Sequence, residues 1–145
     1  MTMIVNEHPK FPLKLTLRID WCDMDIFKHV NNVMYFKYIQ SARVHYWEQS
    51  GLVKLYEQDD IIAMLLSTQC RYIKPLHYPG NVTVQTSVSF IKNTSFGLTH
   101  QLLNEKQEIV AEAQDVMVLM DAKTEEKISI PDTIRATIKQ LEGIH

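Results

Sequence analysis

One uninterrupted stretch, residues 32–50, constrains the fold of this sequence most. It contains no glycine or proline, and Gly51 follows it as a natural helix stop. A helix that is apolar nearly all round is buried on most sides rather than lying on a surface. The sequence therefore predicts one long central helix at about 32–50. Its apolar wheel is made of Val33, Met34, Tyr35, Phe36, Tyr38, Ile39, Ala42, Val44, Tyr46 and Trp47.

Strand-like segments lie on both sides of this predicted helix. Residues 11–21 alternate between apolar and polar side chains, which predicts a half-buried strand. Its predicted apolar face comprises Leu13, Leu15, Leu17, Ile19 and Trp21, and Asp23 would continue it. Four further strands are predicted at 61–73, 82–91, 96–103 and 108–120, the last one central because it is apolar on both faces. Residues 52–60 are predicted to be a loop, and a short helix is predicted near the C-terminus.

This order of elements predicts an α+β fold, with an antiparallel sheet of about five strands around one long helix. The 145 residues suit a single domain spanning 1–145, without repeats or linkers. A sheet can wrap the helix on one side only, so we expect a second copy of the chain to cover the other side.

Composition argues against several classes of partner. The net charge is −2 and no Lys/Arg run occurs, so we expect no nucleic-acid partner. No apolar run approaches the ~18 residues of a membrane-spanning helix, and the first residues do not read as a secretory signal. Cys22 and Cys70 show neither metal-ligand spacing nor a disulfide framework. We therefore expect a cytoplasmic protein without a membrane partner or a metal.

Common catalytic motifs are also missing from the sequence. Its four glycines form no G-x-S-x-G, phosphate-loop or dinucleotide-binding pattern, and no H-E-x-x-H occurs. Five of the six histidines are scattered, and each is interpreted as structural or solvated. These are His8, His45, His77, His100 and His145.

A polar cluster directly precedes the predicted helix. It contains Asp23, Asp25, His29, Asn31 and Asn32. A helix start exposes unpaired N–H groups with positive partial charge, and an acid beside it is placed to act on a polarised carbonyl. The alternative is structural, with one asparagine capping the helix and Asp25 forming a turn. On spacing alone, both interpretations stay open.

The segment D-M-D-I-F-K-H-V-N-N-V-M-Y, followed by A-R, resembles the signature of hotdog-fold acyl-thioester hydrolases. It resembles the 4-hydroxybenzoyl-CoA thioesterase family in its bacterial acyl-CoA thioesterase branch, and it is also similar to plant acyl-ACP thioesterases. The matching residues are Asp23, Asp25, His29, Val30, Asn31, Asn32, Tyr35, Ala42 and Arg43. A later segment, Y-I-K-P-L-H-Y-P-G-N, is similar to a second family motif, and the resemblance covers about residues 11–121.

The resemblance implies a hotdog fold, a homodimer or homotetramer, and hydrolysis of an acyl-CoA. It places the catalytic carboxylate on Asp25, as general base or nucleophile, with His29 and Asn32 orienting the reactants. Backbone N–H groups around Asn32 and Val33 would hold the carbonyl oxygen. The implied substrate-binding residues are Lys28, Asn32, Val33 and Tyr35. No metal or cofactor is implied, because CoA is part of the substrate.

Two departures from the family pattern support an alternative. Lys28 replaces the usual glycine, and Phe27 takes the position of the catalytic asparagine of the plant enzymes. Lys28 would either place a cation near CoA phosphates or point into solvent. These departures are compatible with a non-catalytic hotdog protein that binds acyl thioesters. A hotdog dehydratase ranks last, because its H-x-x-F-x-P-G-type loop is not found.

Overall fold

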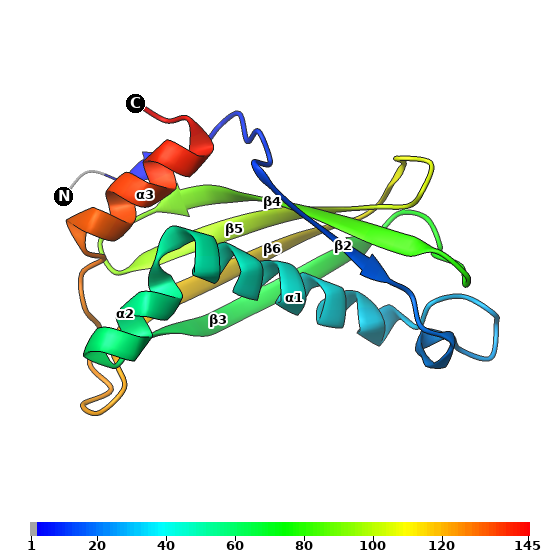
Figure 1. Cartoon of the computed structure of the whole chain (residues 1–145), viewed down its shortest axis with the longest axis horizontal. Coiled ribbons are helices and arrows are strands. Elements are labelled where there is room, and N and C mark those ends of the chain that lie inside the picture. The colour runs from blue at the N-terminus through cyan, green and yellow to red at the C-terminus, as the bar shows by residue number, and fades with distance from the viewer. Residues whose placement is uncertain (1–2) are drawn as a thin grey trace.

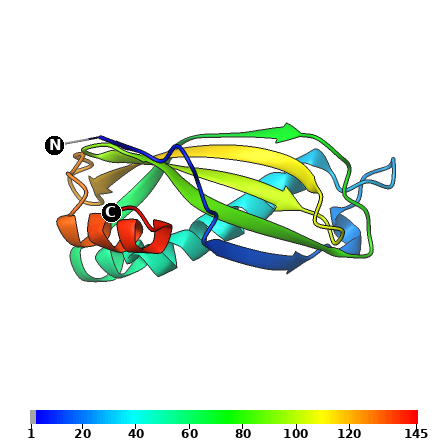
Figure 2. The same cartoon turned by 90° about the horizontal axis from the view of Figure 1, so that it is seen from above.

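The computed structural model describes residues 3–145, in which three α-helices lie on one side of a six-stranded antiparallel sheet (Figures 1 and 2). The strands are β1 (Ile4–Val5), β2 (Leu13–Arg18), β3 (Ile61–Tyr72), β4 (Asn81–Ile91), β5 (Ser95–Leu103) and β6 (Ile109–Asp121). The helices are α1 (Asn32–Ser50), α2 (Leu52–Asp59) and α3 (Asp132–Glu142), and a 3₁₀ turn covers Trp21–Asp23. None of the helices in residues 3–145 is long and apolar enough to cross a membrane.

The predicted central helix is confirmed with its predicted ends. At its start, the side chain of Asn31 accepts a hydrogen bond from the backbone N–H of Val33. At its end, Gly51 has a φ of 92°, a left-handed conformation that costs glycine little. Both boundaries are therefore set by local chemistry that the sequence displays.

The sheet curls around α1, with β2 along one border and β3 along the other (Figure 2). The strand order is β1-β4-β5-β6-β3, and β2 also pairs with β4. The β4–β5 and β5–β6 hairpins follow the predicted order, and β6 is central. However, β3 pairs with β6 rather than with the next strand in sequence, and it has no second partner among residues 3–145. It is therefore an edge strand.

Two local predictions are wrong. In the predicted loop 52–60, Leu52–Asp59 form helix α2, because Leu52 and Leu55, one turn apart, pack into the core beside α1. The first long strand ends at Arg18, and the 3₁₀ turn that follows directs Trp21 outward, where 75% of it is exposed. The buried position predicted for Asp23 is confirmed.

Helix α1 is less completely covered than its apolar wheel predicts. One face packs into the core through Tyr38, Ile39 and Tyr46. Two apolar side chains of its outer face remain exposed, Val33 by 63% and Val44 by 37%. The chain by itself therefore buries one side of its central helix and leaves the other open.

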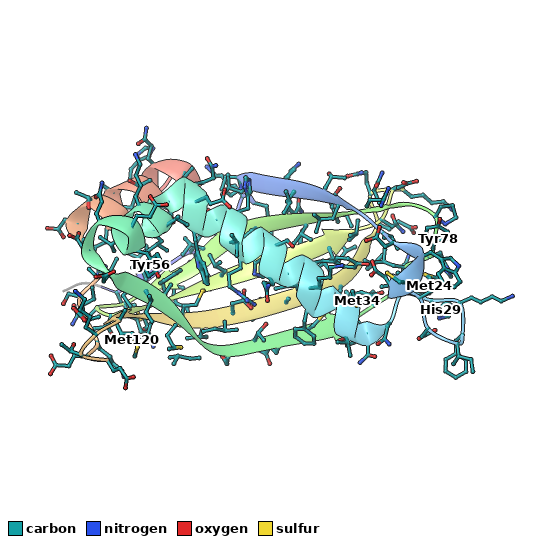
Figure 3. The ribbon with its side chains drawn as sticks, turned by 60° about the horizontal axis from the view of Figure 1, so that its bottom comes forward. Met24, His29, Met34, Tyr56, Tyr78 and Met120 are labelled. Atoms are coloured by element: carbon teal, nitrogen blue, oxygen red, sulfur yellow. The ribbon has the colours of Figure 1, made fainter. Side chains whose placement is uncertain are left out.

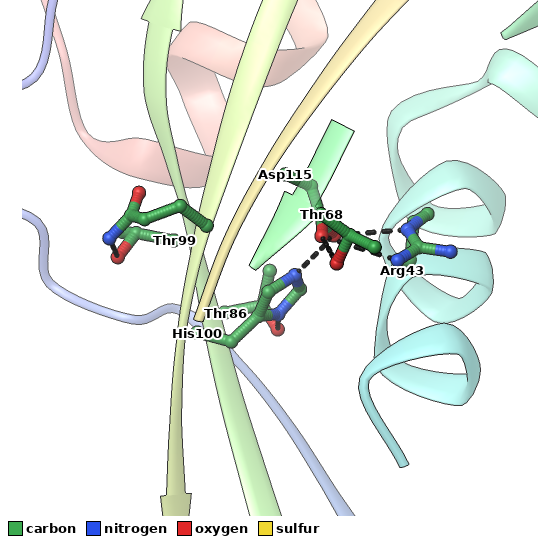
Figure 4. A network of polar contacts seen from close by, with 7 residues as sticks. Arg43, Thr68, Thr86, Thr99, His100 and Asp115 are labelled. Carbon is green, nitrogen blue, oxygen red and sulfur yellow. Dashed lines mark hydrogen bonds and ion pairs between the residues drawn. The ribbon is translucent and has the colours of Figure 1, made fainter. Parts of the chain in front are cut away.

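A buried polar network fastens α1 to the sheet (Figure 4). The Arg43 guanidinium donates two hydrogen bonds to the Asp115 carboxylate on β6, at 2.9 and 3.2 Å. His100 Nε2 lies 2.7 Å from Asp115 Oδ2, and His100 Nδ1 lies 2.8 Å from the hydroxyl of Thr86. The hydroxyl of Thr68 on β3 donates to Asp115 at 2.7 Å. Helix α1, β3 and β5 thus meet at one carboxylate on β6, and Thr86 joins β4 to the network through His100.

Opposing influences act on the pKa of Asp115. Burial alone would raise it, but the hydrogen bonds from His100, Arg43 and Thr68 lower it to about 2, against an ordinary value of 3.8. Because the pKa of Asp115 is lowered in the folded state, the carboxylate stabilises the fold above about pH 4. That contribution is lost as the pH falls through about 2.

We expect Asp115→Asn to lower the free energy of unfolding at pH 7 by about 3–5 kcal/mol, because it leaves the Arg43 charge buried without its counterion. In urea titrations between pH 2 and 7, the variant should also lose less stability on acidification than the wild type. Glu112→Gln is the control, because it removes only a surface pair with Arg71 and should cost well under about 1 kcal/mol. An unchanged acid dependence in Asp115→Asn would contradict this assignment.

Candidate active site

The segment between the 3₁₀ turn and α1, residues 24–30, forms a closed loop that we call the acid loop. The backbone N–H of Asp25 donates to the carbonyl of His29 at 2.8 Å, and Met24 and Val30 form a β-bridge. The N–H of Asn31 closes the base of the loop by donating to the carbonyl of Asp23 at 2.8 Å. Figure 3 shows Met24 and His29 together at the end of the molecule where α1 begins.

The two aspartates of the motif have different environments. Asp23 is 1% exposed, and its Oδ2 accepts hydrogen bonds from the Tyr38 hydroxyl at 2.8 Å and from the backbone N–H of Asp20 at 3.0 Å. Burial and the hydrogen bond to Asp23 raise the pKa of Tyr38, so the Tyr38 hydroxyl stays a neutral donor. Lys37 Nζ lies 3.8 Å from the other carboxylate oxygen. Asp23 is therefore a structural acid.

Asp25 is only half-buried and borders an open cleft of about 660 Å³. Its Oδ1 accepts hydrogen bonds from the N–H groups of Phe27, at 2.8 Å, and His29, at 3.4 Å. Its Oδ2 accepts none from residues 3–145, so one carboxylate oxygen is held in place and the other is available. The cleft is lined by Trp21, Cys22, Met24, Asp25, Lys28 and Tyr78.

The start of α1 offers fewer free amides than predicted. The N–H of Val33 already donates to the side chain of Asn31 at 3.1 Å, and the N–H of Met34 donates to the Asn31 carbonyl. The capping interpretation is therefore confirmed for Asn31, and the Val33 amide is not free to hold a carbonyl oxygen. The N–H of Asn32 has no acceptor within the described chain, so it is the available amide of this turn.

Tyr35 lies one turn further into the helix and is buried. Its hydroxyl donates to the carbonyl of Lys74 at 3.5 Å and accepts from the N–H of Leu76 at 3.2 Å. The ring packs edge-on against Tyr72, with 4.9 Å between centroids. Tyr35 thus fastens the segment after β3 to the helix, and its contact with substrate stays a prediction.

A family model for the thioesterase-like superfamily matches residues 19–138. The chain belongs to this superfamily. It is 21% identical over 131 residues to the long-chain acyl-CoA thioesterase FadM of Escherichia coli (strain K12), covering 89% of this chain and 98% of the relative.

Solved structures share the fold. PA5185 of Pseudomonas aeruginosa is 25% identical, with a TM-score of 0.81 and 97% of both chains covered. SAV2348 of Staphylococcus aureus, solved in complex with CoA, has a TM-score of 0.83 at 14% identity, over 91% of this chain and 84% of that one. The predicted hotdog fold is confirmed, with six strands rather than about five.

The backbone conformation at Lys28 accounts for one departure in the acid loop from the pattern that the sequence resembles. Lys28 takes the position of the glycine in that pattern, and its φ is 63°. This left-handed conformation is easy for glycine and costs another L-residue roughly 1–2 kcal/mol. The chain thus keeps the glycine-type turn with a lysine, and this lysine borders the cleft beside Asp25.

His77 and Tyr78 are the residues at this end of the superfamily fold that sequence reasoning missed. Tyr78 borders the Asp25 cleft (Figure 3). The ring of His77 lies against that of His29, with 5.0 Å between centroids and an interplanar angle of 80°. Their only sequence signal was membership of the second motif, Y-I-K-P-L-H-Y-P-G-N.

Three or more metal-binding side chains do not gather anywhere in residues 3–145. Cys22 and Cys70 are both free. The groups available for chemistry at this end include the Asp25 carboxylate, an imidazole pair, a lysine and a backbone amide, together with the Cys22 thiol and the Tyr78 hydroxyl at the cleft.

We expect Asp23→Asn to lower the free energy of unfolding by about 1–3 kcal/mol, because it weakens the buried acceptor of Tyr38. Tyr38→Phe should cost a similar amount, since it removes the same hydrogen bond from the other side. Urea denaturation of both variants measures the effect. Wild-type stability in both would show that Asp23 has no structural role.

Proposed function

We propose that this protein hydrolyses an acyl-CoA thioester to a carboxylic acid and free CoA. The observation that carries the proposal is the Asp25 carboxylate, which borders an open cleft in the loop directly before α1. Membership of the thioesterase-like superfamily supports it, as do the likeness to FadM and the fold shared with the CoA-bound SAV2348. At a finer level, we assign the chain to the 4-hydroxybenzoyl-CoA thioesterase family on the motif around Asp25.

Two routes are open to Asp25. As a general base, it takes a proton from water while the water oxygen attacks the thioester carbon, and the C–S bond then breaks to release the thiolate. As a nucleophile, its oxygen attacks the same carbon, expels the thiolate and forms a mixed anhydride that water hydrolyses. Neither route needs a metal or a bound cofactor. Appearance of ¹⁸O in the Asp25 carboxylate after a single turnover in ¹⁸O-labelled water would establish the anhydride route, because general-base catalysis leaves both carboxylate oxygens in place.

We assign roles in binding and orientation to the groups around Asp25. The free N–H of Asn32 is available to donate to the carbonyl oxygen as negative charge develops on it. His29 orients the water or the substrate. Lys28 supplies a cation at the cleft for the CoA phosphates, and the exposed Val33 side chain offers apolar contact to the acyl chain. Tyr35 supports this arrangement from within the core.

We expect Asp25→Asn to lower the rate of acyl-CoA hydrolysis by about 100-fold or more, the usual scale for losing an acid–base group. The amide oxygen of asparagine can still accept the hydrogen bond from Phe27, so the free energy of unfolding should change by less than about 1 kcal/mol. A free-thiol assay over a panel of acyl-CoA chain lengths measures the rate.

Asp20→Asn is the matched control. Asp20 lies directly before the 3₁₀ turn, outside the acid loop, and its side chain pairs with Arg18. It should hydrolyse acyl-CoA at the wild-type rate. Wild-type hydrolysis by Asp25→Asn would overturn the mechanism. If neither the wild type nor the variant hydrolyses any thioester, yet both bind one, the non-catalytic binding function replaces the enzyme.

We also propose that the chain acts in the cytoplasm as one domain and as a homodimer or homotetramer. The uncovered face of α1 and the free edge of β3 support the oligomer. Their exposed apolar residues include Val44 on α1 and Met64 and Leu66 on β3. An unpaired strand edge flanked by apolar side chains is a template for pairing with another chain.

We expect light scattering to show a dimer or tetramer at micromolar concentration, and Leu66→Lys to shift it towards monomer. Val5→Lys is the control, because it places the same charge on β1 at the opposite border of the sheet. A monomeric wild type would contradict the proposed assembly.

A further inference from the structure

We propose that His77 is a positioning residue that holds the His29 imidazole in its working orientation. The proposal rests on the proposed function, in which His29 orients the water or substrate beside Asp25. The carrying observation is the edge-to-face contact of the two rings, with centroids 5.0 Å apart and planes 80° apart. This is a favoured geometry for aromatic pairs, because the positive edge of one ring meets the negative face of the other.

The backbone of His29 is fixed, but little else restrains its ring. Its carbonyl accepts from the N–H of Asp25, and its own N–H points at Asp25 Oδ1. The side chain itself is exposed, and its imidazole makes no hydrogen bond within residues 3–145. The contact with the ring of His77 is therefore the described interaction that can restrain rotation of the His29 ring.

The backbone next to His77 is held in place by hydrogen bonds on two sides. The residue before it, Leu76, is buried, and its N–H donates to the Tyr35 hydroxyl on α1. The carbonyl of Leu76 accepts a hydrogen bond from the N–H of Val30 in the acid loop at 2.9 Å. The backbone next to His77 is thus fastened both to the helix and to the loop that carries His29.

His77 also borders a second cleft of about 380 Å³, together with Lys74 and Asn81. Because His77 is exposed, its replacement should leave the core intact. Neither histidine is among the residues that line the Asp25 cleft. His29 is the one that contacts Asp25, through its backbone N–H, and His77 contacts the His29 ring, so we assign His77 a role through His29. The predicted consequence is a change in kcat with little change in KM.

A double-mutant cycle tests this role. We expect His77→Ala to lower kcat by about 2- to 12-fold, the rate equivalent of one aromatic pair, with KM nearly unchanged. In a His29→Ala background, adding His77→Ala should cause no further loss, because the orienting contact is already absent. His77→Phe should restore most of kcat, since it keeps an aromatic ring at this position. His8→Ala, at an exposed histidine elsewhere in the chain, is the control and should behave as the wild type.

A second readout does not need activity. In NMR spectra of the full chain, His77→Ala should shift the ring signals of His29, and His8→Ala should not. Equal losses from His77→Ala in both backgrounds, or an unshifted His29 ring, would overturn the positioning role. A wild type without thioesterase activity would overturn the proposed function instead, and the NMR comparison would still decide whether the two rings are in contact in solution.

Discussion

The structure depends on the buried ion pair between Arg43 and Asp115. A single carboxylate on β6 receives the guanidinium of α1, the imidazole of His100 and the hydroxyl of Thr68. Removing two charges from water is expensive, and attraction repays it only when hydrogen bonds satisfy both partners. Here they do, so the pair fixes both the height and the rotation of α1 over the sheet. The position of α1 also determines where its start, with the cap Asn31 and the first residue Asn32, lies relative to the sheet.

Further hydrogen bonds fix the acid loop relative to α1. Tyr38 on α1 binds Asp23 at the base of the loop, while Tyr35 on α1 accepts a hydrogen bond from Leu76, whose carbonyl accepts one from Val30 in the loop. The two aspartates of one short motif therefore have different environments. Asp23 is held by hydrogen bonds in the core, whereas Asp25 keeps one oxygen free at a cleft. A sequence shows two similar acids, but burial distinguishes them.

Features with local causes were predictable from the sequence. The ends of α1 follow from an asparagine cap and a glycine stop, and the strands follow from alternation. Pairing of β3 with β6 was not predictable, because register between distant strands is set by the whole sheet. Helix α2 was not predicted, because the acidic residues in this short segment made its few apolar positions hard to recognise as a helical face. His77 was set aside because its contact with His29 joins distant parts of the chain, and the roles of Asp25 and His29 in catalysis stay predictions.

The closure of the acid loop by backbone hydrogen bonds has an evolutionary consequence. Asp25 is held by the N–H and carbonyl groups of its own loop, which every amino acid but proline supplies in full. The side chains at the tip, Ile26 and Phe27, are among the most exposed apolar groups of the described chain. Substitutions there can accumulate without moving the acid. The loop thus separates the backbone hydrogen bonds that hold the acid from two tip side chains that are free to change.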